Sequence, residues 1–464
     1  MEEAQMKEEF KTETNETQME EKETEDTQLE EKDSYLQTEV APALIALHPF
    51  DQSIAVTVGS ELRIFNLVKN CAVSLADESK EMLHRDSIRA LRFSDSGKLL
   101  VSAGDDKLVK IWGAESWQCL CTVNSEKRVS AVAISKDEQY VCFADKFGVV
   151  WIVDLVGLAE NQPNPDKNAV AIFGHYCSII TSLEFSPDGR FIVSADRDFK
   201  IRVSVFPKYP LKGVHEIQSF CLGHSEFVSC LTFVHNSDFP QGFLVSGSGD
   251  STVCMWDVTS GSLLCTSDVG REANLSEESH PAVTDLYATA DGSLVAVAIQ
   301  RQALEIPLSF DLLLSILQGI LLLSCDLSAK RLSMLKVVPV PGETFIPTRL
   351  GTKLSGNLLW MVTGASNLPG TKESSFARIR AVSCFKKKSN DSDLEPRVLE
   401  DTEVPGGDQL LEKLQGSVSV ESTVFSAAAD ALNAAMSSLL RKKQYSDEKR
   451  DFRKKTRNDK KFKQ

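Results

Sequence analysis

The chain has 464 residues, 42% of them hydrophobic, which is enough to bury a sizeable core in one large domain or in about two to three smaller ones. Its formal net charge of −15 argues against nucleic acid binding by the chain as a whole, but the charge is unevenly placed. Residues 1–40 carry 15 acidic and 4 basic side chains, whereas residues 441–464 carry 4 acidic and 12 basic ones.

Residues 1–40 are rich in Glu and Thr and contain few large apolar side chains, which predicts a disordered acidic tail. No basic stretch followed by an apolar run is present there, so we expect no secretory signal and a reducing compartment. The 11 cysteines are scattered. Only Cys119 and Cys121 lie close together, without a second pair or a histidine at the spacing of zinc ligands, so we expect no metal site.

Five short segments align with one another and recur roughly every 40 to 50 residues. They are LRIFNL (62–67), VKIWGA (109–114), VWIVDL (150–155), IRVSVF (201–206) and VCMWDV (253–258). Each follows an apolar stretch and a turn built on Asp or Gly, which is typical of two paired strands. Alternating segments such as ITSLEFSPDGR (180–190) precede these pairs. The period predicts the blades of a β-propeller.

The fifth unit carries the full WD-repeat pattern, with Gly223-His224, Ser246, Asp250 and Trp256-Asp257. A buried imidazole, hydroxyl, carboxylate and indole N–H can satisfy one another's hydrogen bonds. We therefore interpret His224, Ser246, Asp250 and Trp256 as a structural staple within the blade. A hydrolytic Ser–His–Asp triad is the alternative, but no Gly-x-Ser-x-Gly elbow is present and parts of the group recur near His84 and His175.

Two weaker units follow the five clear ones. The sixth combines residues 282–300, 319–328 and 331–338, and the seventh combines 348–366 with 376–385. We predict an all-β chain, a seven-bladed WD-repeat β-propeller over residues 41–388, with the strand at 42–49 helping to close the ring.

Residues 301–318 form an atypical insertion where the other blades have a short turn. Together with the next strand this insertion gives an apolar run from Leu312 to Leu323, which is too short to cross a bilayer, so we expect no membrane contact.

Residues 389–425 are polar and contain Pro and Gly, which predicts a flexible linker. Residues 426–464 are rich in helix formers, first apolar and then basic, which predicts a helical to basic C-terminal tail.

The segments FIVSADRDFKIRVS (191–204), SFCLGHSEFVSCL (219–231) and LVSGSGDSTVCMWD (244–257) closely resemble the WD-repeat, non-catalytic subunit of the eukaryotic tRNA guanine-N7 methyltransferase. The resemblance is densest over residues 184–265, and the basic C-terminal end adds to it. It implies a heterodimer in which this chain does no chemistry. A separate Rossmann-like subunit binds S-adenosylmethionine and methylates guanosine in the variable loop of tRNA, while the propeller holds that subunit and keeps it active.

The residues of this chain agree with a non-catalytic role. The sequence offers no Gly-x-Gly that opens a helix after a strand, as a cofactor loop of its own would require. Gly247 and Gly249 do form a Gly-x-Gly, but a strand follows them, so they belong to a turn.

The stretch SADRDFKIRVS (194–204) places five charged side chains between two apolar stretches. We expect Asp196 or Asp198 to accept the hydrogen bonds of the turn, and alternation to place Lys200 and Arg202 on one face of the strand. From the residues alone, a solvated strand end with local ion pairs remains open. The resemblance implies instead that Arg197, Lys200 and Arg202 contact the catalytic subunit.

The basic end of the chain allows two interpretations. It can lie along tRNA phosphates, or it can be a solvated tail that serves as a nuclear localisation signal, and one segment can do both. We expect a nuclear protein, with a cytoplasmic location as the open alternative. Its tRNA-binding candidates are Lys442, Lys443, Arg450, Arg453, Lys454, Lys455 and Arg457.

Two other function classes stay open. The chain could be a WD-repeat scaffold or a ubiquitin-ligase substrate receptor in another complex, although the Trp-Asp-x-Arg motif of such receptors is missing because Val258 and Thr259 follow Trp256-Asp257. It could also be a propeller enzyme with acids at the central channel, but no paired carboxylates stand out, and the fold alone implies no activity.

Overall fold

A computed structural model gives the fold. It describes residues 39–75, 84–158, 167–175, 178–272, 281–300, 319–340, 348–352, 358–369, 375–383, 395–416 and 422–440. The described structure belongs almost entirely to the compact unit Ala41–Gln464. The predicted acidic tail therefore lies outside the described residues except for its last two positions, and so do the insertion at 301–318 and the basic end of the chain.

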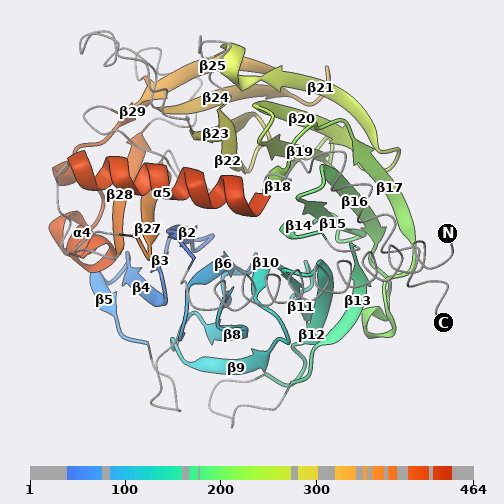
Figure 1. The fold of residues 1–464 in the computed structure, drawn as a ribbon, viewed down its shortest axis with the longest axis horizontal. Helices are drawn as coiled ribbons and strands as arrows, with labels where there is room; N and C mark the ends of the chain where they lie inside the picture. The colour runs from blue at the N-terminus through green and yellow to red at the C-terminus, as the bar shows by residue number, and fades with distance from the viewer. Residues whose placement is uncertain are drawn as a thin grey trace, which may run out of the picture. The chain divides into compact units, whose positions relative to one another are not determined.

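Seven antiparallel sheets follow one another around a ring, as Figure 1 shows, which confirms the predicted seven-bladed β-propeller. Blade one contains β2 (Leu44–Leu47), β3 (Ser53–Val58), β4 (Glu61–Asn66) and β5 (Cys71–Val73). Blade two contains β6 (Ile88–Phe93), β7 (Leu99–Gly104), β8 (Leu108–Gly113) and β9 (Cys119–Asn124). Blade three contains β10 (Val129–Ile134), β11 (Tyr140–Asp145), β12 (Val149–Asp154) and β13 (Val170–Gly174).

Blade four contains β14 (Ile180–Phe185), β15 (Phe191–Asp196), β16 (Lys200–Val205) and β17 (Ile217–Leu222), with the short 3-10 helix η1 (Pro210–Lys212) before β17. Blade five contains β18 (Val228–Val234), β19 (Phe243–Ser248), β20 (Thr252–Asp257) and β21 (Ser262–Asp268), followed by α2 (Val269–Glu272). The five aligned segments of the sequence all fall on the third strand of a blade, as their common pattern predicted.

Blade six is complete among the described residues, with β22 (Ala282–Ala288), β23 (Leu294–Gln300), β24 (Gly319–Asp326) and β25 (Arg331–Pro339). The strands on either side of the insertion pair in regular antiparallel register, from Leu294 with Ser324 to Ala298 with Ile320. The second half of the long apolar run is therefore a buried blade strand. No helix in the described ranges is long and apolar enough to span a membrane.

Blade seven contains β26 (Arg349–Thr352), β27 (Leu359–Ser366), β28 (Ser375–Ser383) and β29 (Arg397–Val398). The short strand β1 (Ala41–Pro42) pairs with β27 and so joins the beginning of the described chain to the last blade. The predicted closing strand at 42–49 is thus divided between two roles. Pro42 and Ala43 bond to blade seven and belong to the closure, and Leu44–Leu47 supplies the innermost strand of blade one.

The predicted flexible linker at 389–425 is wrong for residues 395–416. These residues form β29, the 3-10 helix η2 (Asp401–Glu403) and α4 (Gly407–Gln415). Leu410 and Leu414 on α4 are fully buried against the apolar cluster that contains Phe65 of blade one and Ile379 of blade seven. The segment is polar on average, which led to the linker prediction, but its leucines lie on one face of an amphipathic helix. Burial of these leucines supplies the free energy that orders the helix.

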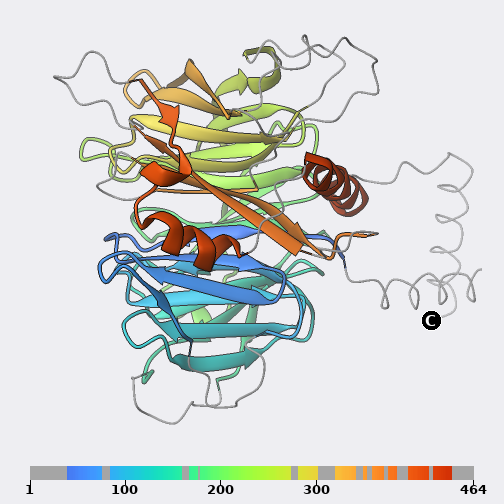
Figure 2. The same ribbon diagram turned by 90° about the vertical axis from the view of Figure 1, so that its left-hand side faces the viewer.

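The predicted C-terminal helix is present as α5 (Ser422–Leu440), which begins four residues before the predicted position 426. Figures 1 and 2 show α5 lying on one face of the ring, whereas α4 lies on its outer side next to β4 and β28.

Candidate interaction surface

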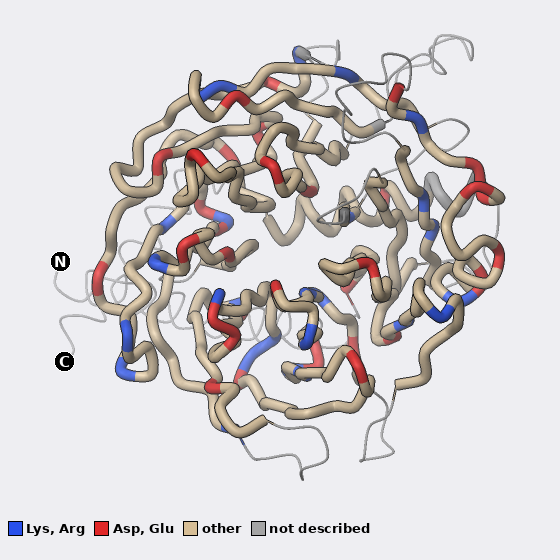
Figure 3. Tube along the Cα trace, turned by 180° about the vertical axis from the view of Figure 1, so that it is seen from behind, with Lys and Arg blue, Asp and Glu red and all other residues tan. Residues whose placement is uncertain are grey.

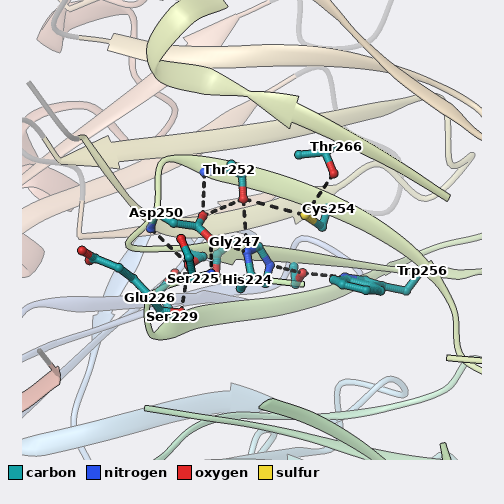
Figure 4. Close-up of polar contacts among 12 residues, drawn as sticks. His224, Ser225, Glu226, Ser229, Gly247, Asp250, Thr252, Cys254, Trp256 and Thr266 are labelled. Carbon is teal, nitrogen blue, oxygen red and sulfur yellow. Dashed lines mark hydrogen bonds and ion pairs between the residues drawn. The ribbon is translucent and has the colours of Figure 1, made fainter. Parts of the chain in front are cut away.

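The staple of blade five has the predicted partners, as Figure 4 shows. The ring of His224 places Nδ1 3.0 Å from Oδ2 of Asp250 and Nε2 2.8 Å from Oγ of Ser246. The indole Nε1 of Trp256 donates to the same hydroxyl oxygen at 2.8 Å. The backbone N–H of Ser225 also donates to Asp250. The structure thus contains the predicted contacts among His224, Ser246, Asp250 and Trp256, and these contacts agree with a structural role.

The burial and charge state of this staple favour a structural role over a hydrolytic one. Burial opposes a charge on His224, but its hydrogen bonds to Asp250 and Cys254 outweigh burial and raise the pKa of the imidazole to about 9. Burial also disfavours the charged carboxylate, but the bond from His224 prevails and lowers the pKa of Asp250 to about 2. A raised pKa, which keeps the imidazole protonated at neutral pH, makes it a poor proton acceptor for Ser246. The Ser246 hydroxyl is fully buried and already bonded to Trp256, so it is not placed to attack a substrate.

The same arrangement recurs in two other blades. In blade two, His84 contacts Asp106 and Ser102 at 2.7 and 2.8 Å, and Trp112 donates to Ser102 at 2.9 Å. In blade four, His175 contacts Asp196 at 2.9 Å and Ser194 at 2.7 Å. A group that repeats around the ring holds strands together, as we expected from the sequence.

Blade four departs from the pattern at two positions. Strand registers align Arg202 with Cys254 and Ser204 with Trp256, so a serine stands where the other two blades carry tryptophan. The histidine partner is Asp196, two residues before the position that corresponds to Asp250. Of the two aspartates left open by the sequence, Asp196 therefore takes the hydrogen bonds of the turn, and it also accepts from the backbone N–H of Lys200 at 3.0 Å.

Arg202 occupies the space beside the missing indole. Its Nε donates to Oγ of Ser204 at 3.0 Å, and its guanidinium lies 4.6 Å from the ring centre of Phe173. One terminal nitrogen also donates to the carbonyl of Gly174 at 3.3 Å. Arg202 is therefore half-buried and packs blade four against the outer strand of blade three, instead of projecting freely as a surface charge.

Lys200 is the exposed member of the predicted set. Ile201 and Val203 are fully buried, so the strand alternates as expected and places Lys200 and Arg202 on the opposite face. Register pairs Lys200 with Leu222 and Arg202 with Phe220 on the neighbouring strand β17. Because Leu222 is 62% and Phe220 44% exposed, this face combines a lysine with accessible apolar area. We call Lys200, Phe220 and Leu222 the blade-four surface.

Arg197 lies apart from this surface, in the turn before β16. Its Nε is 4.0 Å from Oδ1 of Asp198, and a terminal guanidinium nitrogen donates to the carbonyl oxygen of Leu439 in α5 at 3.4 Å. The strand thus does not present Arg197, Lys200 and Arg202 as three equivalent contacts. Phe220 and Leu222 on β17 were not among the contact residues predicted from the sequence. The run IQSFCL is unusually apolar for an outer strand, and this is the signal that could have identified them.

The other predicted sites have different outcomes. Lys442, Lys443, Arg450, Arg453, Lys454, Lys455 and Arg457 lie outside the described residues. Within the part of the chain that the structure describes, no group of three or more His, Cys, Asp or Glu side chains is arranged to hold a metal ion. Figure 3 shows basic and acidic positions interspersed around the ring, whereas the strong charge separation of the sequence lies at its two ends.

Comparison with known proteins gives one matching family profile, described as the tRNA methyltransferase TRM82 WD40 domain, over residues 2–171 and 159–315. Relatives named tRNA (guanine-N(7)-)-methyltransferase non-catalytic subunit wdr4 are 32% identical over 245 residues in Dictyostelium discoideum and 36% over 228 residues in Danio rerio. These alignments cover 50% and 48% of this chain and 50% and 51% of the relatives. The chain thus spans about half the length of the relatives it matches.

Solved structures show the fold alone. The structure called "Crystal structure of RRP9 WD40 repeats" superposes with a TM-score of 0.54 at 19% identity, covering 73% of this chain and 94% of the other. "Structure of U3-55K" gives 0.53 at 19% identity, with 69% and 88% covered. Both support the propeller architecture.

Proposed function

The chain belongs to the tRNA methyltransferase TRM82 WD40 domain family, and on that premise we propose that it is the non-catalytic subunit of a tRNA guanine-N7 methyltransferase complex. In this proposal it binds and stabilises a separate catalytic subunit, which carries S-adenosylmethionine and forms m7G in the variable loop of tRNA. The observation that carries the proposal is the family match, which extends over residues 2–315 and includes the whole of blades four and five.

The blade-four surface supports the place of contact with the catalytic subunit. Lys200 forms no ion pair with any residue that the structure describes, and Leu222 beside it is largely exposed. A lysine beside accessible leucine and phenylalanine offers both apolar area that a partner can bury and a charge that can pair with an acidic partner group. Arg202 contributes by fixing β16 against blade three.

The basic C-terminal segment supports a role in binding tRNA and a nuclear location. Its 12 Lys and Arg side chains within residues 441–464 can neutralise phosphates and can also serve as a localisation signal. We therefore propose both tRNA binding and nuclear localisation for this segment.

Co-expression with the methyltransferase subunit from the same source tests the proposal. We expect the wild-type chain to co-purify with that subunit and to support N7-methylation of tRNA. Lys200→Glu should reduce the recovered catalytic subunit at least about tenfold, because it places a negative charge opposite an acidic partner and removes the hot-spot contact. Methylation should fall in parallel.

Lys107→Glu is the matched control. Lys107 is an exposed lysine in the corresponding turn of blade two, where its φ of 64° matches the 71° of Phe199 next to Lys200. The Lys107→Glu variant should bind the catalytic subunit as the wild type does. Arg202→Glu is less suitable alone, because it also disrupts packing against Phe173. If the wild-type chain recruits no methyltransferase, the proposed function is wrong and a general scaffold replaces it.

A further inference from the structure

The last helix of the described chain lies across one face of the ring and contacts blades that are not neighbours. Figures 1 and 2 show α5 passing from blade seven toward blade four on this face. Ala428 is 2% and Leu432 8% exposed, so one stripe of the helix is buried, and the helix also contacts β27. Polar contacts in the C-terminal half of α5 add to this apolar burial.

One such contact is a side-chain pair in the middle of the helix. Gln300, the last residue of β23 in blade six, is 2% exposed, and its Nε2 donates to Oδ1 of Asn433 on α5. A buried amide that lost this partner would leave a donor without a hydrogen bond, which is costly. The bond from Gln300 to Asn433 therefore stabilises the position of α5 more than the same bond from an exposed glutamine would.

The second contact is at the C-terminal end of α5. The last turn contains no basic residue of its own, and helix carbonyls at this end lack intrahelical donors. Arg197 of blade four donates to the carbonyl oxygen of Leu439 at 3.4 Å. A guanidinium at this position supplies both a donor and a positive charge, which interacts favourably with the negative end of the helix dipole.

We propose that Gln300 and Arg197 form an intramolecular docking surface for α5, and that Arg197 is a positioning residue for this helix, not a contact for the catalytic subunit. This surface joins blade six to blade four through the helix. It separates the roles of two basic residues only three positions apart, because Arg197 faces α5 whereas Lys200 lies on the exposed edge beside Leu222. The anchoring stands without the proposed function, and only the assignment of partner contacts rests on it.

Hydrogen exchange measured by mass spectrometry on the full chain tests the anchoring without any partner. Peptides from residues 422–440 should exchange about 3- to 10-fold faster in Arg197→Ala and in Gln300→Ala than in the wild type, as expected from the loss of one hydrogen bond. Lys200→Ala is the control, since the described structure places none of its contacts on α5 and its exchange over these residues should be unchanged.

Two results would overturn the inference. Equal exchange in Arg197→Ala and Lys200→Ala, with unchanged peptides in blade four, would show that Arg197 does not hold the helix. In the co-expression assay, Arg197→Ala should retain the catalytic subunit that Lys200→Glu loses. If Arg197→Ala loses it while exchange over 422–440 stays at the wild-type rate, Arg197 is a partner contact after all.

Discussion

A single exchange of tryptophan for serine sets the character of blade four. Trp112 and Trp256 each donate an indole N–H to the staple serine of their blade, and each is fully buried. Ser204 cannot fill that volume, and Arg202 instead folds over it and stacks on Phe173. The arginine thereby stabilises the strand that carries Lys200, so a change in one core residue shapes the exposed edge of the blade.

The ion pair of His224 and Asp250 predicts a specific pH dependence of stability. The folded-state pKa of His224 is raised from 6.5 to about 9, so its contribution is fully present below pH 6.5 and is lost as the pH rises through 9. A shift of this size corresponds to roughly 3 kcal/mol at most. The pKa of Asp250 is lowered to about 2, so its contribution is lost only in strong acid.

Urea unfolding of the wild type and of His224→Gln, measured between pH 6 and 9.5, checks this prediction. The stability advantage of the wild type should be largest near pH 6 and should shrink toward pH 9.5. The advantage of the wild type over Asp250→Asn should shrink with rising pH in the same way, because this variant removes the partner that raises the pKa of the imidazole. An advantage that stays constant over this range would contradict a charged His224.

At the scale of single elements, local patterns in the sequence predicted strands better than helices and caps. Segments with period two, such as 180–190, lie on the expected strands because the alternation follows directly from burial of one face. The choice between Asp196 and Asp198 needed the register of β15 and β16. The contact of Arg197 with Leu439 joins residues 242 positions apart, and no local signal encodes such a separation.

Helix α4 shows why the linker prediction failed. Gly406 and Gly407 both have positive φ, so the residues that suggested flexibility in fact form the turn into the helix. Arg63 of blade one then donates to the carbonyls of Leu414 and Gln415 at 3.1 and 2.9 Å, which satisfies the C-terminal end of α4. These partners are about 350 residues away in the chain and are visible only in the folded ring.

Leu414→Ala should destabilise the protein by about 2–4 kcal/mol, because Leu414 is fully buried between blades one and seven and its loss leaves a cavity. Leu335→Ala is the control, since Leu335 is 55% exposed and its replacement should change stability by less than about 0.5 kcal/mol. Urea unfolding midpoints compare the two variants. Equal midpoints would mean that α4 contributes nothing to the ring.

At the scale of the whole ring, charged side chains connect blades across the central channel. Arg92 of blade two donates two hydrogen bonds to the carboxylate of Glu184 in blade four, at 2.8 and 2.7 Å, and so passes over blade three. Arg349 of blade seven pairs with Asp285 of blade six at 3.0 Å. A cavity of about 510 Å³ lies among these groups. The Arg92–Glu184 pair thus joins blades two and four, which are not neighbours, and the Arg349–Asp285 pair strengthens the contact between the neighbouring blades six and seven.

Closure of the ring depends on a very short stretch at the beginning of the described chain. Ala41 pairs with Ser366, and Ala43 is held by a bond from its N–H to Gly364 at 2.8 Å and by a bond to its carbonyl from Thr348 at 2.8 Å. Ala41 and Ala43 are both fully buried. Blade seven therefore contains strands from both ends of the propeller, which is how a ring of separate sheets avoids an open edge.

Deleting residues 1–43 should therefore lower the free energy of unfolding by about 2–4 kcal/mol, since it removes several buried backbone hydrogen bonds worth roughly 1 kcal/mol each. Deleting residues 1–38 leaves these contacts intact and should leave stability unchanged, because it removes only residues that precede them. Urea unfolding compares the two truncations, and hydrogen exchange in β27 locates the change. If both truncations unfold at the same urea concentration, blade seven is held by α4 and its neighbouring blades, and the pairing of β1 with β27 does not stabilise the closed ring.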